Sequence, residues 1–415
     1  MSYKSKIISA IEKNDIIHKK LKKSLLDSKA INIVENFIID NKLICYGGTA
    51  INSILPESKK IYDYSLDIPD YDFFSPTPLI HAKKLARIYA ENGFENIESK
   101  SALFKGTYKV FVNFVPVADI TLVEEYIYEK LKSKSLEINK MLFVSSDFLK
   151  MSLYQELSRP LGDISRWEKI YNRLTILQEY LKEDILISLQ LYKIPNNKIN
   201  KSIYNKLKNI CINNKVVLFG DFGLSFYLKY FPSHIKNIIN KCKIKQMFIL
   251  SETIEDITEL LKDIKYDIIL HKNTGKFSND IYEIIINGFS FIYVFITTSC
   301  QSFNIIRKNN NIYNIATIDT IISNYYSLEY SNIKNIDITN IKSYCYLLEN
   351  IHSNNKNNIL KRFYIPCIGH QETVSDIKNN RNLVYKKYKN NKTHKKYLEL
   401  FFKYYPKTKK NIKTL

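Results

Sequence analysis

Three aspartates set in apolar surroundings are the residues whose chemistry stands out in this chain. Asp70 and Asp72 occupy alternate positions of a predicted strand, so their side chains project from the same face. Asp119 lies inside another apolar run, where an ionised carboxylate without a partner is costly. Such carboxylates suit two Mg²⁺ or Mn²⁺ ions, which activate a hydroxyl and neutralise a leaving pyrophosphate. The pattern predicts nucleotidyl transfer.

A glycine pair upstream supplies the second part of the pattern. Gly47 and Gly48 follow the apolar run 43–46 and precede a helical pattern, which predicts a strand, a tight turn and a helix start. Backbone N–H groups at such a turn, with the Thr49 hydroxyl, can hold phosphates, and we assign Asn52 to the nucleotide as well. A Gly-Gly turn or an Asp-x-Asp pair alone is usually structural; their order and apolar setting favour catalysis.

These residues resemble the motifs of the DNA polymerase β-type nucleotidyltransferase superfamily. Within it, three stretches are similar to the poly(A) polymerase catalytic subunits of giant viruses and, more distantly, of poxviruses: Ile-Pro-Asp-Tyr-Asp-Phe-Phe at 68–74, Gly-Thr-Tyr-Lys-Val-Phe-Val-Asn at 106–113, and residues 157–167. The resemblance covers about residues 30–180. It implies that Asp70 and Asp72 bind both metals, that Asp119 activates the primer 3′-hydroxyl, and that the glycine turn holds the triphosphate.

The expected activity is template-independent polyadenylation of RNA (mRNA) 3′ ends, with AMP transferred from ATP. ATP as the substrate rests on the resemblance, because base choice cannot be read from the sequence. Two alternatives stay open: another RNA or small-molecule nucleotidyltransferase, and a non-catalytic RNA-binding or processivity subunit with relic carboxylates. The resemblance also implies a viral homodimer in the host cytoplasm or viral factory, with packaging in the virion as an option.

Composition agrees with this expectation. The chain has 415 residues, 45% of them hydrophobic, which is enough for two or more cores. Its 62 basic and 41 acidic residues give a net charge of +21, a field that favours polyanions such as RNA. The chain begins with a charged amphipathic segment rather than a signal peptide, and no run approaches about 18 apolar residues. We expect no membrane partner.

The six cysteines are scattered without a Cys-x-x-Cys pair, so neither a zinc site nor a disulfide framework is expected. A reducing cytoplasm is the simple inference.

The fold class expected is α/β (α+β), a mixed nucleotidyltransferase sheet with flanking helices. Helical periodicity covers residues 1–40, which we expect to pack on the sheet, and then 79–89 and 146–181, the last broken near Pro160; residues 109–123 read as a strand. Arg166, Lys169 and Arg173 share one helix face. That face holds triphosphate or RNA phosphates, or is equally well a solvated face above Trp167.

The second half contains a faint internal repeat. Residues 216–225 have the shape of 43–52, and strands at 245–251 and 281–297 follow in the same order. In this alignment Gln246, Phe248 and Phe295 stand where the three aspartates stand. The repeat predicts a degenerate nucleotidyltransferase-like domain unable to hold two metals; the alternative is an unrelated α/β domain with a chance glycine turn.

The expected domains are a catalytic domain at 1–185, an inactive copy at 205–350 and a basic aromatic tail at 351–415, with a linker near 184–204. Residues 381–415 carry twelve Lys or Arg against Glu399 alone, interleaved with aromatic rings. Lysines neutralise phosphates and rings stack bases, so this tail is expected to bind RNA. The lysines assigned to RNA are Lys386, Lys387, Lys389, Lys395 and Lys396. The alternative is a basic helix whose Leu398, Phe401 and Phe402 turn toward the core.

Overall fold

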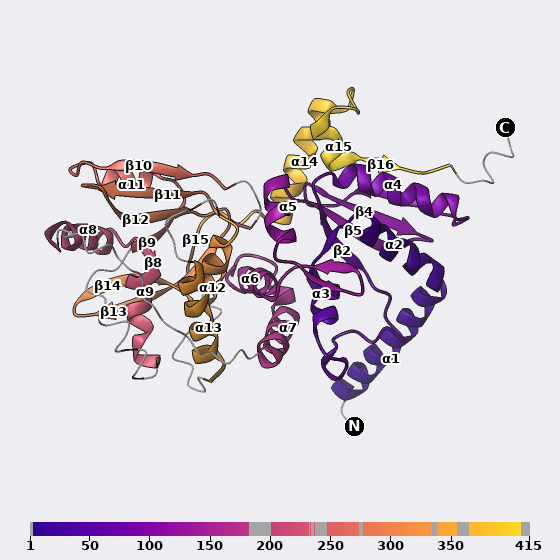
Figure 1. The fold of residues 1–415 in the computed structure, drawn as a ribbon, viewed down its shortest axis with the longest axis horizontal. Helices are drawn as coiled ribbons and strands as arrows, with labels where there is room; N and C mark the ends of the chain where they lie inside the picture. Colours follow the sequence, from indigo (N-terminus) through magenta and orange to yellow (C-terminus); the bar gives the residue numbers. More distant parts are fainter. Residues whose placement is uncertain are drawn as a thin grey trace. The chain divides into compact units, whose positions relative to one another are not determined.

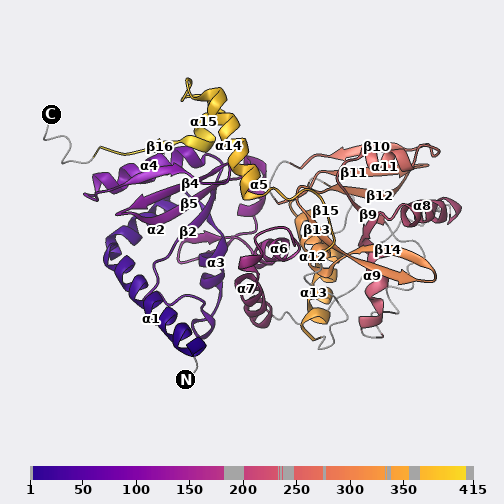
Figure 2. The same ribbon diagram turned by 180° about the vertical axis from the view of Figure 1, so that it is seen from behind.

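The computed structural model divides the chain into two compact units, which are drawn in Figures 1 and 2. The first unit comprises residues 1–149 and 373–415, and the second comprises 150–372. The structure describes residues 3–181, 201–231, 233, 236, 247–273, 277–331, 333, 338–354 and 365–407.

An eight-stranded mixed sheet forms the centre of the first unit, in the order β16-β3-β4-β5-β2-β1-β7-β6. Its strands are β1 (Ile44–Cys45), β2 (Tyr71–Ser75), β3 (Glu98–Ser101), β4 (Thr107–Val112), β5 (Val115–Leu122), β6 (Leu136–Ile138), β7 (Met141–Phe143) and β16 (Lys403–Tyr404). Burial alternates along β4, where Tyr108 and Val110 are buried while Lys109 is half-buried. One face of the sheet therefore packs on the core and the other stays open.

The helices of this unit are α1 (Tyr3–Ser24), α2 (Ser28–Asp40), α3 (Gly47–Ile54), α4 (Pro78–Glu91), α5 (Glu125–Lys132), α14 (Val374–Tyr388) and α15 (Lys395–Phe401), with the 3₁₀ turn Glu57–Lys59. Helices α2 and α4 pack together on the buried face, where the Tyr89 hydroxyl donates to the Ala30 carbonyl at 2.8 Å. The expectation that residues 1–40 pack on the sheet holds for α2 only. Helix α1 buries no residue, and its large apolar side chains are exposed. Lys19 and Lys23 make polar contacts from this helix, with the Asp67 carboxylate and the Tyr64 carbonyl.

The single strand expected over residues 109–123 is wrong, because the chain reverses within it. Strands β4 and β5 form an antiparallel hairpin. The two residues at its turn, Asn113 and Phe114, have φ of 48° and 66°. Two successive positive φ values are the geometry of the tight turns that match strand twist. The turn lacks the Asn-Gly signature, so the apolar run hid it.

The C-terminal segment belongs to the first sheet. Strand β16 pairs antiparallel with β3, through Lys403 with Lys100 and Tyr404 with Ser99. Arg381 on α14 donates to the carbonyls of Ala102 and Leu103, at 2.9 and 3.2 Å, and to that of Leu400 at 2.7 Å. The side chain of Phe402 is buried beside Tyr108. Residues 373–407 of the expected tail are therefore built into the first unit, whereas its described residues before 373 belong to the second unit. Residues 408–415 lie outside the description.

A second eight-stranded mixed sheet has the order β10-β11-β12-β9-β8-β14-β13-β15. Its strands are β8 (Val217–Phe219), β9 (Met247–Ser251), β10 (Asp267–His271), β11 (Ile281–Ile286), β12 (Phe289–Ile296), β13 (Gln301–Lys308), β14 (Asn311–Ala316) and β15 (Cys367–Ile368). The helices are α7 (Trp167–Tyr180), α8 (Lys201–Asn213), α9 (Gly220–Tyr227), α11 (Glu255–Leu260), α12 (Ile318–Leu328) and α13 (Ile338–Asn354), with 3₁₀ turns at Ile164–Arg166 and Leu228–Tyr230. Helix α6 (Ser146–Leu157) contains the boundary between the two units. The two mixed sheets with flanking helices confirm the expected fold class.

The two sheets share one topology. β3-β4-β5-β2-β1-β7 of the first and β10-β11-β12-β9-β8-β14 of the second have the same order and the same parallel or antiparallel sense at every step. Gly220, like Gly47, begins a helix after a strand with positive φ, 68° against 71°. A Cβ on Gly220 would lie 2.9 Å from Phe248, just as one on Gly47 would lie 2.6 Å from Asp72. This shared geometry supports the predicted repeat.

One position of the predicted repeat is wrong. Asp72 pairs with Asp119 in the first sheet, whereas Phe248 pairs with Tyr293 in the second. Tyr293, two residues before Phe295, therefore stands where Asp119 stands. The sequence alignment missed this offset because apolar strands of period two match equally well after a shift of two residues. Gln246 lies outside the described residues.

The boundaries of the two units also differ from the expected domain boundaries. Residues 150–181 group with the second unit rather than with a domain ending at 185, and residues 373–407 group with the first. The absence of a disulfide was predicted wrongly, because Cys300 and Cys367 are bonded, with 5.4 Å between their Cα atoms. The bond joins the residue just before β13 to the first residue of β15. These strands are neighbours in the sheet, but the two cysteines are 67 residues apart in the chain, so spacing gave no signal.

Candidate active site

The carboxylates of Asp72 and Asp119 come from adjacent parallel strands. The two residues are direct partners in the pairing of β2 with β5, so their side chains leave the sheet on the same face. Both are half-buried, whereas the residues preceding them, Tyr71 and Ala118, are buried in the core. The structure thus brings together the two strands that the sequence predicted, on the open face of the sheet.

Asp119 has one oxygen engaged and one without a partner. Its Oδ2 lies 2.5 Å from the Lys109 ammonium, which reaches it from the neighbouring strand β4. Its Oδ1 is buried and has no hydrogen-bond partner among the described residues. A buried carboxylate oxygen left in this way is costly unless a cation or a donor binds it. The donor set therefore fits a hard divalent cation.

Gly47 is required by the close approach of the chain to Asp72. Its φ of 71° disfavours any side chain, and a Cβ there would lie 2.6 Å from the Asp72 Oδ2. The Tyr46 N–H also donates to the Asp72 carbonyl at 2.9 Å. The start of α3, with its unpaired backbone N–H groups, is consequently held beside the carboxylate. Such a helix start suits phosphate groups.

Asp70 lies at the exposed edge of the site, just before β2. Its pKa is raised to about 6, first by desolvation and then by the Asp119 charge, while Lys109 acts in the opposite direction. The side chain reaches the surface, yet the protein around it still reduces its hydration enough to disfavour the charged form. A bound cation would reverse this effect by pairing with the carboxylate.

Thr49 and Asn52 hold the backbone around the site. The Thr49 hydroxyl donates to the Asp70 carbonyl at 2.9 Å, and the Asn52 Oδ1 accepts from the N–H groups of Ile61 and Tyr62. Both side chains are buried and line a cavity of about 290 Å³ on the Tyr71 side of the strand. These contacts fix the loop that carries Asp70. Direct binding of the nucleotide by Thr49, Asn52 or Gly48 stays a prediction.

Lys109 is the site residue that the sequence did not single out. It lies in the recognised stretch 106–113, and alternation in the β4–β5 hairpin would have placed it opposite Asp119. A chain of hydroxyls supports the same face: Thr121 contacts the Tyr46 hydroxyl at 2.8 Å and the Thr107 hydroxyl at 3.1 Å.

The other predicted residues belong to other elements of the fold. Arg166 and Lys169 belong to the second unit, where Arg166 is 3.5 Å from the Glu156 carboxylate, and the pKa of Lys169 is lowered by desolvation and then by Arg173 and Arg166. Their role in triphosphate binding stays a prediction. The five lysines assigned to RNA, from Lys386 to Lys396, are exposed on and beside α14 and α15. Their role is likewise untested.

Two further observations concern metal ligands and membrane-spanning helices. In the described ranges, no three His, Cys, Asp or Glu side chains are already gathered at metal-binding distance. The three aspartates are therefore not gathered at that distance, and their role as metal ligands stays a prediction. Across the same ranges, no helix is both long and apolar enough to span a membrane.

Comparisons with known proteins agree with the motifs. Residues 32–163 match the family model of the poly(A) polymerase catalytic subunit, which confirms the resemblance. The chain is 27% identical over 222 residues to the putative poly(A) polymerase catalytic subunit of Acanthamoeba polyphaga mimivirus, covering 51% of this chain and 38% of that protein. It is 29% identical over 165 residues to the protein of that name from African swine fever virus (isolate Tick/Malawi/Lil 20-1/1983), covering 36% of this chain and 33% of that one. The match thus spans less than two fifths of these relatives.

The fold is similar along nearly the whole chain to that of a solved structure. The Megavirus polyadenylate synthase superposes with a TM-score of 0.75 at 20% identity, covering 99% of this chain and 87% of that one.

Proposed function

We propose that this chain, whose residues 32–163 match the catalytic subunits of poly(A) polymerases, transfers AMP from ATP to the 3′-hydroxyl of RNA without a template. The substrate RNA would be mRNA, and the protein would act as a viral homodimer in the host cytoplasm or viral factory. The assignment of ATP, RNA and the dimer rests on the family resemblance. The assignment of the chemistry rests on the site.

One observation supports this chemistry: the buried Oδ1 of Asp119, which has no hydrogen-bond partner in the part of the chain that the structure describes, lies on the strand next to Asp72, on the same face. Asp70, Asp72 and Asp119 would together hold two Mg²⁺ or Mn²⁺ ions. When bound, these ions lower the pKa of the attacking hydroxyl and neutralise the pyrophosphate that leaves. The burial of this Oδ1 favours metal binding, because a fully solvated aspartate would have water on both oxygens.

The protein's own part is to position the reactants. Of the three aspartates, Asp119 on β5 lies nearest to strands β4 and β3. It would therefore face the primer 3′-hydroxyl. The start of α3, with Gly47 and Gly48, holds the triphosphate on the other side of Asp72. Thr49 keeps the Asp70 backbone in place through its hydrogen bond to the Asp70 carbonyl. Holding the two reactants in line accounts for most of the rate gain expected in such a reaction.

We also propose that the second unit contains an inactive copy of the catalytic domain. Phe248 and Tyr293 occupy the places of Asp72 and Asp119, and neither side chain binds Mg²⁺. The shared strand order supports the duplication. This copy would serve as a scaffold or as an RNA surface.

Extension of a labelled RNA primer with each of the four nucleoside triphosphates tests this function. The proposal predicts extension with ATP in Mg²⁺ and none in excess EDTA. Efficient use of UTP or another nucleotide would favour a different nucleotidyltransferase. RNA binding with no incorporation of any nucleotide would favour the processivity subunit and overturn the enzymatic proposal.

A further inference from the structure

Three lysines form a line across the open face of the first sheet and lead to the catalytic carboxylates. Lys403 on β16 pairs with Lys100 on β3, and Lys100 pairs with Lys109 on β4. Lys109 pairs in turn with Asp119, whose partner is Asp72. Directly paired residues project from the same face of a sheet. We call Lys109, Lys100 and Lys403 the lysine row.

The lysine row faces outward rather than toward the core. The Lys109 and Lys100 side chains are 34% and 36% exposed, and Lys403 is exposed as well. The residues that alternate with them, Ser99 and Tyr108, are buried on the opposite face. Since neighbouring strands lie about 4.8 Å apart, Lys403 is about 14 Å from Asp119 along the row. The row is long enough to contact more than one phosphate of an extended strand.

The order of the strands separates this row from the triphosphate site. Strand β1 and the Gly47 turn lie on one side of β2, whereas β5, β4, β3 and β16 lie on the other. The Asp72 carboxylate is thus between the turn that suits a triphosphate and the lysine row. The two reactants must approach the carboxylates from different directions, so the lysine side is left for the acceptor.

We infer that the lysine row binds the phosphodiester backbone of the RNA primer and guides its 3′ end to Asp119. This inference rests on the proposed function and names the path of its acceptor strand. Lysine side chains suit it because they neutralise phosphates without reading bases, as an enzyme that extends any 3′ end requires.

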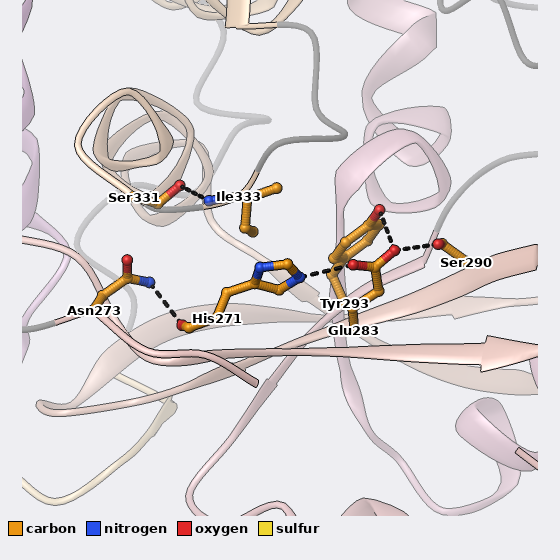
Figure 3. Close-up of polar contacts among 7 residues, drawn as sticks. All are labelled: His271, Asn273, Glu283, Ser290, Tyr293, Ser331 and Ile333. Atoms are coloured by element: carbon orange, nitrogen blue, oxygen red, sulfur yellow. Dashed lines mark hydrogen bonds and ion pairs between the residues drawn. The ribbon is translucent and has the colours of Figure 1, made fainter. Parts of the chain in front are cut away.

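The second sheet shows that the fold does not need these charges. The places of Lys100 and Lys109 are taken there by Ile269 and Glu283. Ile269 pairs with Glu283, and Glu283 pairs with Tyr293, in the same register. Figure 3 shows that Glu283 is satisfied internally: it accepts from Ser290 and from the Tyr293 hydroxyl, and it contacts His271 Nε2 at 2.7 Å. A sheet of the same topology is therefore built without a lysine row.

Local carboxylates hold the row in place when no RNA is bound. Lys100 lies 2.5 Å from the Glu98 carboxylate, which also accepts from the Tyr405 hydroxyl at 2.8 Å. Glu98 thus ties β3 to the C-terminal segment that delivers Lys403. This contact adds to the Arg381 hydrogen bonds and the buried Phe402 that anchor the C-terminal segment on the catalytic sheet.

Fluorescence anisotropy of a labelled single-stranded RNA, measured without metal over a range of salt, tests the inference. The double variant Lys100→Ala/Lys403→Ala should reduce the slope of log K against log salt by about 1.4, since each phosphate contact on a single strand contributes about 0.7. Between about 50 and 200 mM salt, the wild type should therefore lose about sevenfold more affinity than the variant. Lys100→Arg/Lys403→Arg should keep the wild-type slope.

Lys84→Ala is the matched control, because Lys84 is an exposed lysine on α4, which packs on the opposite face of the sheet. It should bind RNA like the wild type. Unfolding temperatures of all variants exclude a folding defect as the cause. An unchanged affinity and salt slope in the folded double variant would overturn the inference.

Steady-state extension kinetics distinguish whether the lysine row binds the phosphates of the RNA primer or those of ATP. The double variant should raise the KM for the primer and leave the KM for ATP unchanged at saturating primer. A raised KM for ATP with unchanged RNA binding would assign the row to the triphosphate and refute the inference. If the protein extends no RNA at all, the proposed activity fails, and the anisotropy experiment still decides whether the row binds RNA.

Discussion

Replacing Asp70 by asparagine should stabilise the metal-free protein while destroying its activity. The Asp70 pKa rises from 3.8 to about 6, mainly through desolvation and then through repulsion from Asp119. The charged carboxylate is therefore less stable in the folded protein than in the unfolded chain. Asparagine keeps the shape of the side chain and removes the charge.

The expected gain in stability follows from the size of the change in the Asp70 pKa. Two pKa units correspond to about 3 kcal/mol, and screening at this exposed position reduces the expected gain to about 1 kcal/mol. Because the folded pKa lies above the unfolded one, the penalty is complete above about pH 6 and disappears below about pH 4. Asp70→Asn should thus raise the unfolding temperature by about 2–4 °C near pH 7.5, and the gain should shrink as the pH falls.

Thermal unfolding in EDTA at several pH values measures this gain. Asp63→Asn is the matched control, since Asp63 lies in the same loop and its pKa is lowered by hydrogen bonds from Ser65, so no gain is expected. Added Mg²⁺ should stabilise the wild type more than Asp70→Asn. A variant that is less stable than the wild type near pH 7.5, or a gain that does not depend on pH, would show that the Asp70 charge does not destabilise the folded protein.

Three further outcomes are expected. Gly47→Ala should abolish extension and destabilise the fold by about 1–3 kcal/mol, because a Cβ would meet Asp72. Gly93 also has a positive φ but faces open space, so Gly93→Ala should lose stability and keep activity in the same assays. Arg381→Ala should cost about 1.5–3 kcal/mol in urea unfolding through its lost bonds to three carbonyls, and an equally stable variant would show that this anchor is dispensable. Desolvation acts to raise the pKa of Glu283, but hydrogen bonds from Ser290 and His271 outweigh it, so the pKa is lowered. The stability that Glu283 contributes should therefore be lost as the pH falls through that lowered value. Glu283→Gln should flatten this loss in acid unfolding curves, and an unchanged profile would contradict this role of Glu283.

The sequence predicted the parts of the site that short-range patterns encode. Alternation predicted that Asp72 lies on the face opposite the buried Tyr71 and Phe73, and the glycine pair marked the start of α3. The partnership of Asp72 with Asp119 followed from two apolar runs that had to share a sheet. These features depend on local periodicity and on the conformations open to glycine.

Long-range pairing is what the sequence did not reveal. Strand β16 joins the first sheet through only two residues, too few for a periodic signal, and the Cys300–Cys367 bond joins strands brought together by the sheet. Tyr293 was missed because a shift of two residues along an apolar strand leaves the pattern unchanged. Lys109 gained meaning only when the hairpin placed it against Asp119.

Metal-dependent incorporation of AMP into an RNA primer by Asp72→Ala and Asp119→Asn measures whether these carboxylates hold the catalytic metals. Each variant should lose at least about a hundredfold in incorporation, since each removes a carboxylate from the metal site. RNA affinity and unfolding temperature should stay close to those of the wild type. Retention of a tenth or more of the wild-type activity by Asp72→Ala would contradict the claim that these aspartates form the active site.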